Sequence, residues 1–448
     1  MFPSSALKLR DELARGERSS REVTEHYLKR IEEQADLGAF VHVAENAMEA
    51  AAAADQAHAR GDIGRLHGLP TAFKDLSDVA GMPTTYGTAA MPAMVAERDH
   101  SLVARLRAEG VVVLGKTQVP EFGLSSYSEN LVAPPSRNPF DPTRSSGGSS
   151  GGQAAAIAAG MIPLGPGSDG GGSVRIPAAA CGLVGLKPSL GRVPSDILDG
   201  YTDPMGAPKL AVSGPLAHDA LDAALLLDAM RGKDHYLPLL QGSYPQRLDG
   251  LKIGYSIHSP FEPVYEITLA QEARASFAQG LERLGERHRV QPANLHYATD
   301  YPETFAAVWT NGLKDVPVAD DSLLGDLARD FRRRAADRSL EQSLQAGSRL
   351  KQIAADFVRQ WSAYDVVATP AMASIPPKIG HYTQSTADVD YMLQCQYTPY
   401  TSMVNVASVA AITVPVGHSN EGLPMSIQLI SPRSDEGLLL ALAAQMQV

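Results

Sequence analysis

Two serines, each in its own glycine-rich stretch, are the residues of this chain best suited to chemistry. Ser149 lies in Arg144-Ser-Ser-Gly-Gly-Ser-Ser-Gly-Gly-Gln153, and Ser173 lies in Gly165-Pro-Gly-Ser-Asp-Gly-Gly-Gly-Ser-Val-Arg175. Because glycine has no Cβ, glycines beside a serine let the backbone come close to a reacting atom. The pattern predicts an enzyme in which a serine hydroxyl attacks its substrate.

A serine hydroxyl is a weak nucleophile until a nearby base takes its proton. Lys74 ends the segment Gly68-Leu-Pro-Thr-Ala-Phe-Lys-Asp75, which we expect to be extended and apolar. Composition alone favours a surface lysine, but burial would lower the pKa of the amine because desolvation penalises the charged form. We expect Lys74 to be buried, neutral and available as the base.

Attack on a carbonyl also requires hydrogen-bond donors for the negative oxygen that forms. Four consecutive residues, Gly170, Gly171, Gly172 and Ser173, offer backbone NH groups at a predicted helix start. We expect them to form an oxyanion hole.

These motifs occur together with several others in a fixed order along the chain. The further matches are Asn138-Pro-Phe-Asp141, Cys181-Gly-Leu-Val-Gly-Leu-Lys-Pro188, Gly191-Arg-Val193, Ser213-Gly-Pro-Leu216, Val414-Pro-Val-Gly417 and Gly422-Leu-Pro424. Taken together, the chain resembles the amidase signature family of serine hydrolases over most of its length.

The resemblance implies a role for each catalytic candidate. Ser173 would be the nucleophile that accepts the acyl group, Ser149 a bridging serine preceded by a cis peptide bond, and Lys74 the base. Asp169 and Arg175 would brace the loop around the nucleophile; a partly exposed ion pair is the alternative for these two.

The resemblance also places Ser125, Ser126 and Tyr127 in the substrate pocket. The chain departs from the usual family pattern at Ser146, where proline is common, and at Phe73, where a smaller residue is usual. A glycine-proline pair is replaced by Ser-Val-Ala at 408–410. These departures leave the triad intact but leave the pocket shape, and hence the substrate, open.

Helical and strand patterns alternate along the chain, which predicts an α/β fold. We expect a twisted mixed β-sheet covered by helices on both faces, in a single domain over 1–448. Its parts would be an N-terminal helical part at 1–65, the signature core at 66–230, a helical insertion at 231–375, and a lid-like loop with C-terminal strands and a helix at 376–448. The predicted strands are 39–44, 111–115, 162–164, 251–255, 365–368 and 411–416, and the predicted helices are 46–60, 101–109, 218–230, 269–284, 322–361 and 436–446.

Composition narrows the function classes. A formal net charge of −11 disfavours a nucleic-acid surface, and no window approaches the roughly 20 apolar residues of a membrane span. Cys181 and Cys395 fit neither a disulfide framework nor a zinc site, and none of the 12 histidines has a ligand or triad context. We expect buried cysteines, no metal and no cofactor. The N-terminal residues lack the pattern of a secretory signal, which favours the cytoplasm.

Two other motifs suggest different chemistry. Gly147-Gly-Ser-Ser-Gly151 matches the G-x-S-x-G nucleophile elbow, but turn-forming sequence at 138–144 stands where that elbow needs a strand. Gly165-Pro-Gly-Ser-Asp-Gly170 matches a dinucleotide-binding fingerprint, with Asp196 as its acidic partner. A lone fingerprint is weak, and oxyanion binding explains this stretch better.

We therefore expect a serine amidohydrolase that cleaves small amides, including anilides and carbamates, similar to stand-alone bacterial amidases and urethanases. The alternative within the family is the glutamine-hydrolysing subunit of a tRNA-dependent amidotransferase, and the non-enzymatic alternative is a nucleotide-binding module. The expected partner is a small amide or carbamate. We expect neither nucleic acid nor membrane as a partner, and a homodimer remains open.

Overall fold

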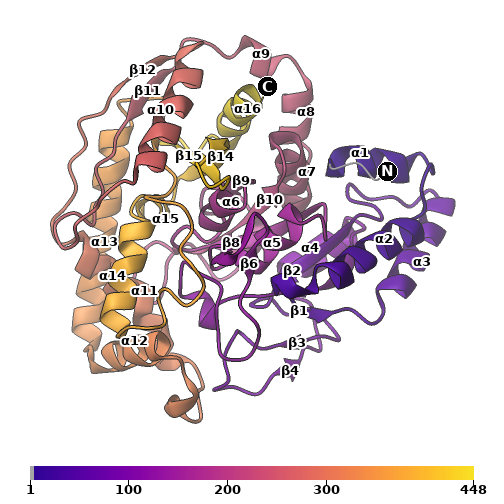
Figure 1. Cartoon of the computed structure of the whole chain (residues 1–448), viewed down its shortest axis with the longest axis horizontal. Helices are drawn as coiled ribbons and strands as arrows, with labels where there is room; N and C mark the ends of the chain where they lie inside the picture. The colour runs from indigo at the N-terminus through magenta and orange to yellow at the C-terminus, as the bar shows by residue number, and fades with distance from the viewer. Residues whose placement is uncertain (1–4, 448) are drawn as a thin grey trace.

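Short runs of apolar and β-branched residues form one mixed sheet at the centre of the computed structural model, which describes residues 5–447 (Figure 1). The strand order is β12-β11-β13-β15-β14-β9-β10-β8, with β12, β11 and β13 parallel and the other neighbours antiparallel. The strands are β8 (Leu164–Asp169), β9 (Val184–Lys187), β10 (Val212–Ala217), β11 (Lys252–Tyr255), β12 (Arg289–Pro292), β13 (Val366–Pro370), β14 (Ala410–His418) and β15 (Pro424–Ser431).

Both faces of this sheet are buried under helices, as the sequence predicts. In β13, Val366 and Ala368 belong to one apolar cluster and Val367 to another, because successive side chains of a strand point to opposite faces. The first face is covered by α7 (Ala220–Arg231), α10 (Gln271–Gly285) and α16 (Glu436–Met446), and the second by α11 (Tyr301–Thr310), α13 (Leu340–Trp361) and α15 (Ser402–Val406). The fold is the predicted single α/β domain.

A smaller sheet joins the N-terminal part to the large one. It has the order β1-β5-β2, built from β1 (Phe40–Val43), β5 (Val112–Thr117) and β2 (Pro70–Lys74). The Thr71 hydroxyl on β2 donates a hydrogen bond to the Leu164 carbonyl on β8 at 3.1 Å. The adjoining helices are α1 (Ala6–Ala14), α2 (Ser20–Glu33), α3 (Ala47–Ala59) and α4 (Ser101–Ala108), and Figure 1 shows them grouped on one side of the molecule.

The remaining elements are short or lie at the periphery. The helices are α5 (Gly151–Ala158), α6 (Arg175–Ala180), α8 (Tyr236–Gln241), α9 (Tyr244–Arg247), α12 (Asp326–Asp337) and α14 (Ala387–Tyr397). The strands are β3 (Pro83–Thr84), β4 (Met94–Val95), β6 (Arg137–Asn138) and β7 (Asp141–Ser145). Single 3-10 turns occur at Ala35–Leu37, Glu121–Gly123, Pro194–Ile197, Asn311–Asp315 and Asp321–Leu323.

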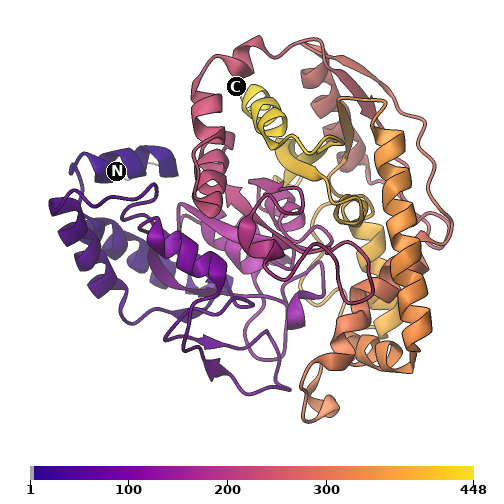
Figure 2. The same ribbon diagram turned by 180° about the vertical axis from the view of Figure 1, so that it is seen from behind.

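The single helix predicted over 322–361 is wrong, because the chain breaks between α12 and α13. Arg338 has extended φ and ψ angles, and Ser339 begins α13 with a capping box. In this box the Ser339 hydroxyl accepts from the Gln342 amide at 3.1 Å, and the Gln342 side chain accepts from the Ser339 amide at 2.9 Å. Figure 2 shows α13 as a long helix at the edge of the molecule.

The segment 376–399, predicted to be an irregular loop, contains α14. Its N-cap is Thr386, whose hydroxyl accepts from the Val389 amide at 3.5 Å. The helix alternates apolar and polar residues without a clear periodic face, which explains why the sequence pattern does not reveal it. Residues of this segment line both cavities described below.

Two further expectations about the glycine-rich region need correction. The stretch before Ser149 is not only a turn, because β6 and β7 form a small hairpin there, separate from the large sheet. The strand predicted at 162–164 instead runs as β8 through the glycines to Asp169, paired with β10. Gly165 and Gly167 therefore lie inside a strand and do not form a turn.

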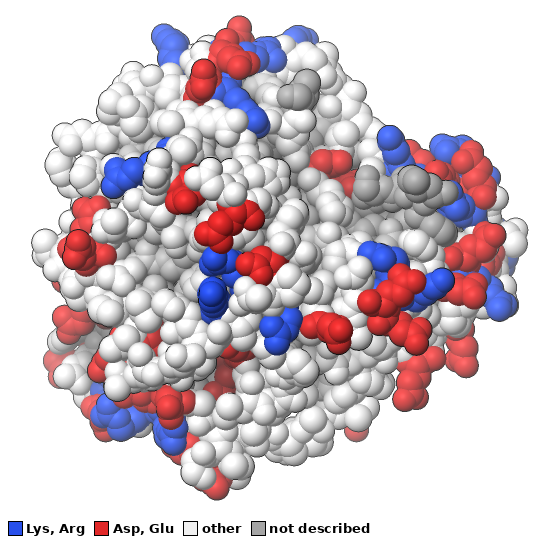
Figure 3. All heavy atoms as spheres, in the orientation of Figure 1, with Lys and Arg blue, Asp and Glu red and all other residues white. Residues whose placement is uncertain are grey.

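Charged side chains are mixed on the molecular surface seen in Figure 3. Lysines and arginines alternate with acidic residues on this face, and no continuous basic area covers it. Within residues 5–447, no helix has the length and apolar character needed to cross a membrane. Residues 1–4, on which the expectation about a secretory signal partly rests, lie outside the described residues. Cys181 and Cys395 are free and buried, as predicted.

Candidate active site

The two sheets bring Lys74 and the glycine-rich loops to one place. Lys74 is the last residue of β2, and Asp169 is the last residue of β8. Ser149 lies in the turn before α5, and Ser173 lies two residues before α6. All of these residues are buried.

The Lys74 amine contacts Ser149 directly. Its Nζ donates a hydrogen bond to Ser149 Oγ at 2.6 Å and another to Ser168 Oγ at 3.0 Å. Desolvation lowers the pKa of Lys74 to about 7, and the nearby Asp169 carboxylate opposes this shift. A large share of the Lys74 side chains is therefore neutral at pH 7, as the apolar sequence context suggests.

Ser149 and Ser173 belong to adjoining loops that are held together by the backbone. The Gly148–Ser149 peptide bond is cis. The Ser150 amide donates to the Ser173 carbonyl at 3.2 Å. Of the three candidate catalytic residues, Ser173 is the one that lines a cavity.

Asp169 and Arg175 form a completely buried ion pair, 2.9 Å between Nη2 and Oδ1. The alternative of a partly exposed pair is therefore wrong. Arg175 also donates to the Gln428 side chain at 2.6 Å and to the Thr401 carbonyl at 3.0 Å. Asn405 donates to Asp169 Oδ1 at 2.9 Å. This network anchors both ends of the loop that carries Ser173.

The glycine loop itself is held from two sides. The Gly172 amide donates to Asp169 Oδ1 at 2.8 Å, and the Thr401 hydroxyl donates to the Gly171 carbonyl at 2.6 Å. Gly172 has a φ of +130°, and a Cβ there would lie 2.5 Å from Thr401 Oγ1, so only glycine fits. Among residues 5–447, no hydrogen-bond acceptor pairs with the amides of Gly170, Gly171 or Ser173.

An inner cavity of about 60 Å³ opens directly onto Ser173 and Gly171. Most of its wall is apolar or aromatic, and none of its lining residues is Lys, Arg, Asp or Glu. The other lining residues are Leu124, Ser125, Ser126, Ile176, Phe261, Phe305, Trp309, Tyr391, Gln394, Cys395, Thr398 and Ser402. The cavity can hold a small uncharged group next to the Ser173 hydroxyl.

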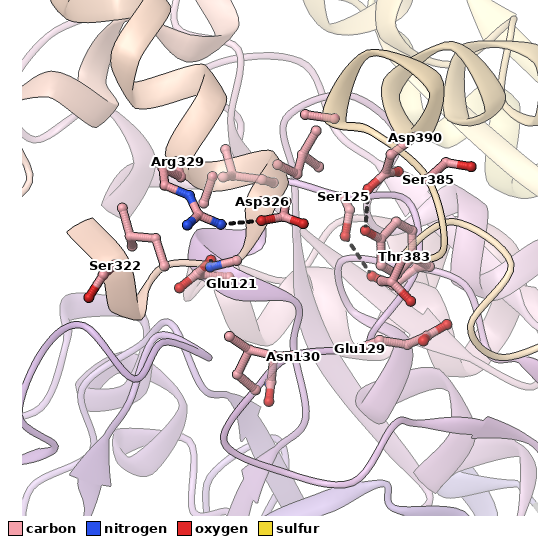
Figure 4. Close-up of a pocket in the computed structure, with 18 residues that line it drawn as sticks. Glu121, Ser125, Glu129, Asn130, Ser322, Asp326, Arg329, Thr383, Ser385 and Asp390 are labelled. Carbon is pink, nitrogen blue, oxygen red and sulfur yellow. Dashed lines mark hydrogen bonds and ion pairs between the residues drawn. The ribbon is translucent and has the colours of Figure 1, made fainter. Parts of the chain in front are cut away.

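An outer cavity of about 470 Å³ shares Leu124 and Ser125 with the inner one (Figure 4). Asp326 and Arg329 on α12 face Ser125 and Asp390 across it, and Asp326 is paired with Arg329. Its other carboxylates accept hydrogen bonds from uncharged donors, as when Asp390 Oδ2 accepts from Tyr127 Oη at 2.7 Å. Desolvation raises the pKa of Asp390 to about 6.

The three residues expected in the substrate pocket are divided between these cavities. Ser125 lines both, Ser126 lines the inner cavity, and Tyr127 lines the outer one. The Ser126 amide donates to the Gln394 side chain at 2.8 Å, which ties this loop to α14. The Tyr127 ring stacks on Tyr382 with 4.6 Å between ring centroids.

Sequence reasoning missed several residues of the site. Ser168, which contacts Lys74, was overlooked although it directly precedes Asp169. Asn405 and Thr401 come from α15 and its N-terminal flank, far away in sequence, and no local signal marks them. Tyr301, Phe305 and Trp309 do carry a signal, since aromatic residues four apart lie on one face of a helix.

The structure disfavours the other two motif interpretations. Asp196 accepts hydrogen bonds from the amide and hydroxyl of Ser213 at 2.8 and 2.7 Å, so it is already engaged by protein groups. The glycines of the dinucleotide fingerprint lie within β8. The strand β7 before Ser149 fits the elbow better than expected, but the hydroxyl of Ser149 pairs with a lysine and not with a histidine.

Comparison with known proteins decides the family. A family model described as "Amidase" matches residues 22–440. The chain belongs to the amidase signature family. As a member of this family it is a hydrolase that acts on carbon–nitrogen bonds.

Relatives of this amidase fall into two functional groups by name. It is 38% identical to "Putative amidase AmiB2" of Mycobacterium tuberculosis, over 97% of this chain and 94% of that protein. It is also 32% identical to a glutamyl-tRNA(Gln) amidotransferase subunit of Cupriavidus necator, over 99% and 96%. Among solved structures, 6-aminohexanoate cyclic dimer hydrolase in complex with its substrate superimposes with a TM-score of 0.88 at 25% identity, covering 99% of this chain and 96% of that one.

Proposed function

We propose that this amidase cleaves small amides by acyl transfer to Ser173, with Ser149 and Lys74 as its proton relay. The observation that carries the proposal is the 2.6 Å hydrogen bond between a buried Lys74 amine and Ser149, beside a loop whose Ser173 opens onto a cavity. A lysine with a pKa of about 7 can both accept and return a proton at neutral pH.

In the first half of the reaction, Ser173 Oγ attacks the carbonyl carbon of the amide. Its proton passes to Ser149, whose own hydroxyl proton passes to Lys74. The tetrahedral intermediate collapses as the carbon–nitrogen bond breaks, and the protonated lysine returns the proton through Ser149 to the departing amine. Water, deprotonated by the same relay, then attacks the acyl-enzyme and releases the acid.

The negative oxygen of the tetrahedral intermediate would be held by backbone amides of the glycine loop. Of the four amides expected to do this, those of Gly170, Gly171 and Ser173 remain as donors, because the Gly172 amide is bound to Asp169. The Asp169–Arg175 pair would keep the loop in position without touching the substrate. Fixed donors of this kind are often the largest single contribution to catalysis.

The two cavities support an assignment of the two halves of the substrate. The acyl group stays bonded to Ser173, so we place it in the inner cavity, which Ser173 lines. We place the amine in the outer cavity, from which it can leave to solvent. Anilides and carbamates are included because the same acyl transfer accepts an aromatic amine or an alkoxy carbonyl, and the structural relative named as a cyclic dimer hydrolase acts on a compact amide.

A substrate panel tests this function. Purified protein is assayed on aliphatic amides, anilides, glutamine and aryl carbamates, with Ser173→Ala as the matched control. We expect Ser173-dependent release of amine from small uncharged amides and from at least one of the other two uncharged classes. Equal activity of wild type and Ser173→Ala on every substrate would refute the proposal.

The glutamine-hydrolysing amidotransferase component is the second candidate, since one relative bears that name. Free glutamine carries a carboxylate and an ammonium group, whereas the inner cavity has no charged lining residue to bind either. This observation favours uncharged substrates. Ammonia released from glutamine alone, and only when partner subunits are added, would support the amidotransferase instead.

A further inference from the structure

The inner cavity is bounded by an aromatic stack on α11. Tyr301, Phe305 and Trp309 are spaced four residues apart and stack in sequence, with centroid distances of 5.7 and 6.0 Å and interplanar angles of 7° and 13°. Phe305 and Trp309 line the cavity. Helical spacing places the three rings on one face, so they form one continuous wall.

This wall is fixed from behind and pressed against the glycine loop. Tyr301, fully buried, shares a 2.8 Å hydrogen bond with the Ser402 hydroxyl, and Phe261 meets the Phe305 ring edge to face at 6.2 Å. At the other end, a Cβ on Gly170 would lie 2.7 Å from the Trp309 ring. The indole therefore packs on the loop that carries the nucleophile and closes the cavity on that side.

The size of the cavity limits what Ser173 can carry as an acyl-enzyme. Its volume of about 60 Å³ offers room for roughly four water-sized groups. The aromatic wall recognises carbon chains by apolar contact and offers no charged partner. A longer chain would have to displace Trp309 or Phe305 from a packed stack.

We propose that the stack of Tyr301, Phe305 and Trp309 sets the acyl specificity, so that the amidase takes short uncharged acyl groups and Trp309 fixes the length limit. This inference rests on the proposed function. It concerns only the acyl half of the substrate, because the outer cavity is several times larger.

Two substitutions should move this limit in opposite directions. Trp309→Ala removes the closing indole and lengthens the cavity. Gly171→Ala adds a methyl group to it, because a Cβ there would lie 3.8 Å from Phe305 and 4.0 Å from Ser402, in ordinary contact with both. The Gly171 amide is kept, and its φ lies outside the left-handed region, so the added methyl fits without strain.

The test measures kcat/KM on p-nitroanilides with acyl chains of two to eight carbons. We expect the wild type to be at least tenfold better on its best short acyl group than on the octanoyl substrate, since a single methylene in an apolar pocket changes selectivity about 10- to 200-fold. Trp309→Ala should raise the octanoyl-to-acetyl ratio at least tenfold, and Gly171→Ala should raise the acetyl-to-butanoyl ratio at least tenfold. Ratios within one variant are unaffected by a general loss of activity.

Phe140→Ala is the matched control, because this aromatic ring is 49% exposed and lines neither cavity; its length profile should equal that of the wild type. If Trp309→Ala does not fold, Trp309→Leu serves in its place, with folding checked by thermal unfolding. A wild type that accepts octanoyl and acetyl groups equally, or variants whose ratios do not change, would overturn the inference. The proposed function would survive that result, since it fails only if hydrolysis does not depend on Ser173.

Discussion

Lys74 Nζ lies 2.6 Å from Ser149 Oγ, and the exposed fractions of the two residues are only 4% and 2%. The pair brings together the end of β2 and the turn before α5, which are 75 residues apart in sequence. Because the amine is desolvated, its pKa falls to about 7, where a proton can move in either direction at neutral pH.

The activity should therefore depend on one ionisation near neutrality. Protonated Lys74 cannot accept a proton, so kcat/KM should fall tenfold per pH unit below a pKa of about 7 in the free enzyme. The measurement is a pH–rate profile on an uncharged amide between pH 5 and 9. A flat profile would contradict a neutral lysine base.

Substitution of Lys74 and of Ser149 should be strongly non-additive. Either Lys74→Ala or Ser149→Ala alone should lower kcat/KM by roughly 10²- to 10⁴-fold, because each breaks the same proton path. The double variant should be little worse than the poorer single variant. Effects that simply multiply would show that the two residues do not form one relay.

Replacing Lys74 by methionine should stabilise the fold while removing activity. The folded pKa of about 7 lies below the unfolded value, so between these two values the unfolded chain binds more protons and the wild type gains stability as pH rises. We expect Lys74→Met to increase the free energy of unfolding by about 2 to 4 kcal/mol at pH 7, allowing for its lost hydrogen bonds.

That gain should shrink as the pH approaches 10, because the wild type no longer has to lose a proton on folding. Urea unfolding at pH 7 and at pH 9.5 measures both values. A methionine variant that is less stable at both pH values would show that Lys74 is not desolvated as the structure indicates.

Removing Arg175 should destabilise the fold strongly. Its guanidinium and the Asp169 carboxylate are both wholly buried, so Arg175→Met leaves a buried charge unpaired. Such a change costs about 3 to 5 kcal/mol. The matched control is Arg349→Met, whose partner Asp300 is 43% exposed, and there the loss should stay below about 1 kcal/mol. Similar effects in the two variants would argue against the bracing role of Arg175.

The parts of this molecule that sequence could predict are those with a local signal. The capping box at Ser19 gives α2, and the glycine clusters give the loops of Ser149 and Ser173. Lys74 could be connected with the two serines only through the family resemblance, because the contact depends on the pairing of distant strands.

The failures have equally physical reasons. The break at Ser339 was hidden inside a continuous helical pattern, although a Ser–Gln capping box marks it. The strand β8 is rich in glycine and proline, which are poor strand formers, and it is stabilised by its pairing with β10. The network around Asp169 draws on Thr401, Asn405 and Gln428, which only the folded sheet brings to the loop.

Covalent labelling of the nucleophile tests the central claim most directly. A fluorophosphonate probe reacts with an activated serine hydroxyl, and peptide mass spectrometry identifies the residue that carries it. We predict a single adduct on Ser173, which is lost in Ser173→Ala while the thermal unfolding of that variant stays close to that of the wild type. An adduct on Ser149, or labelling that persists in Ser173→Ala, would contradict the account.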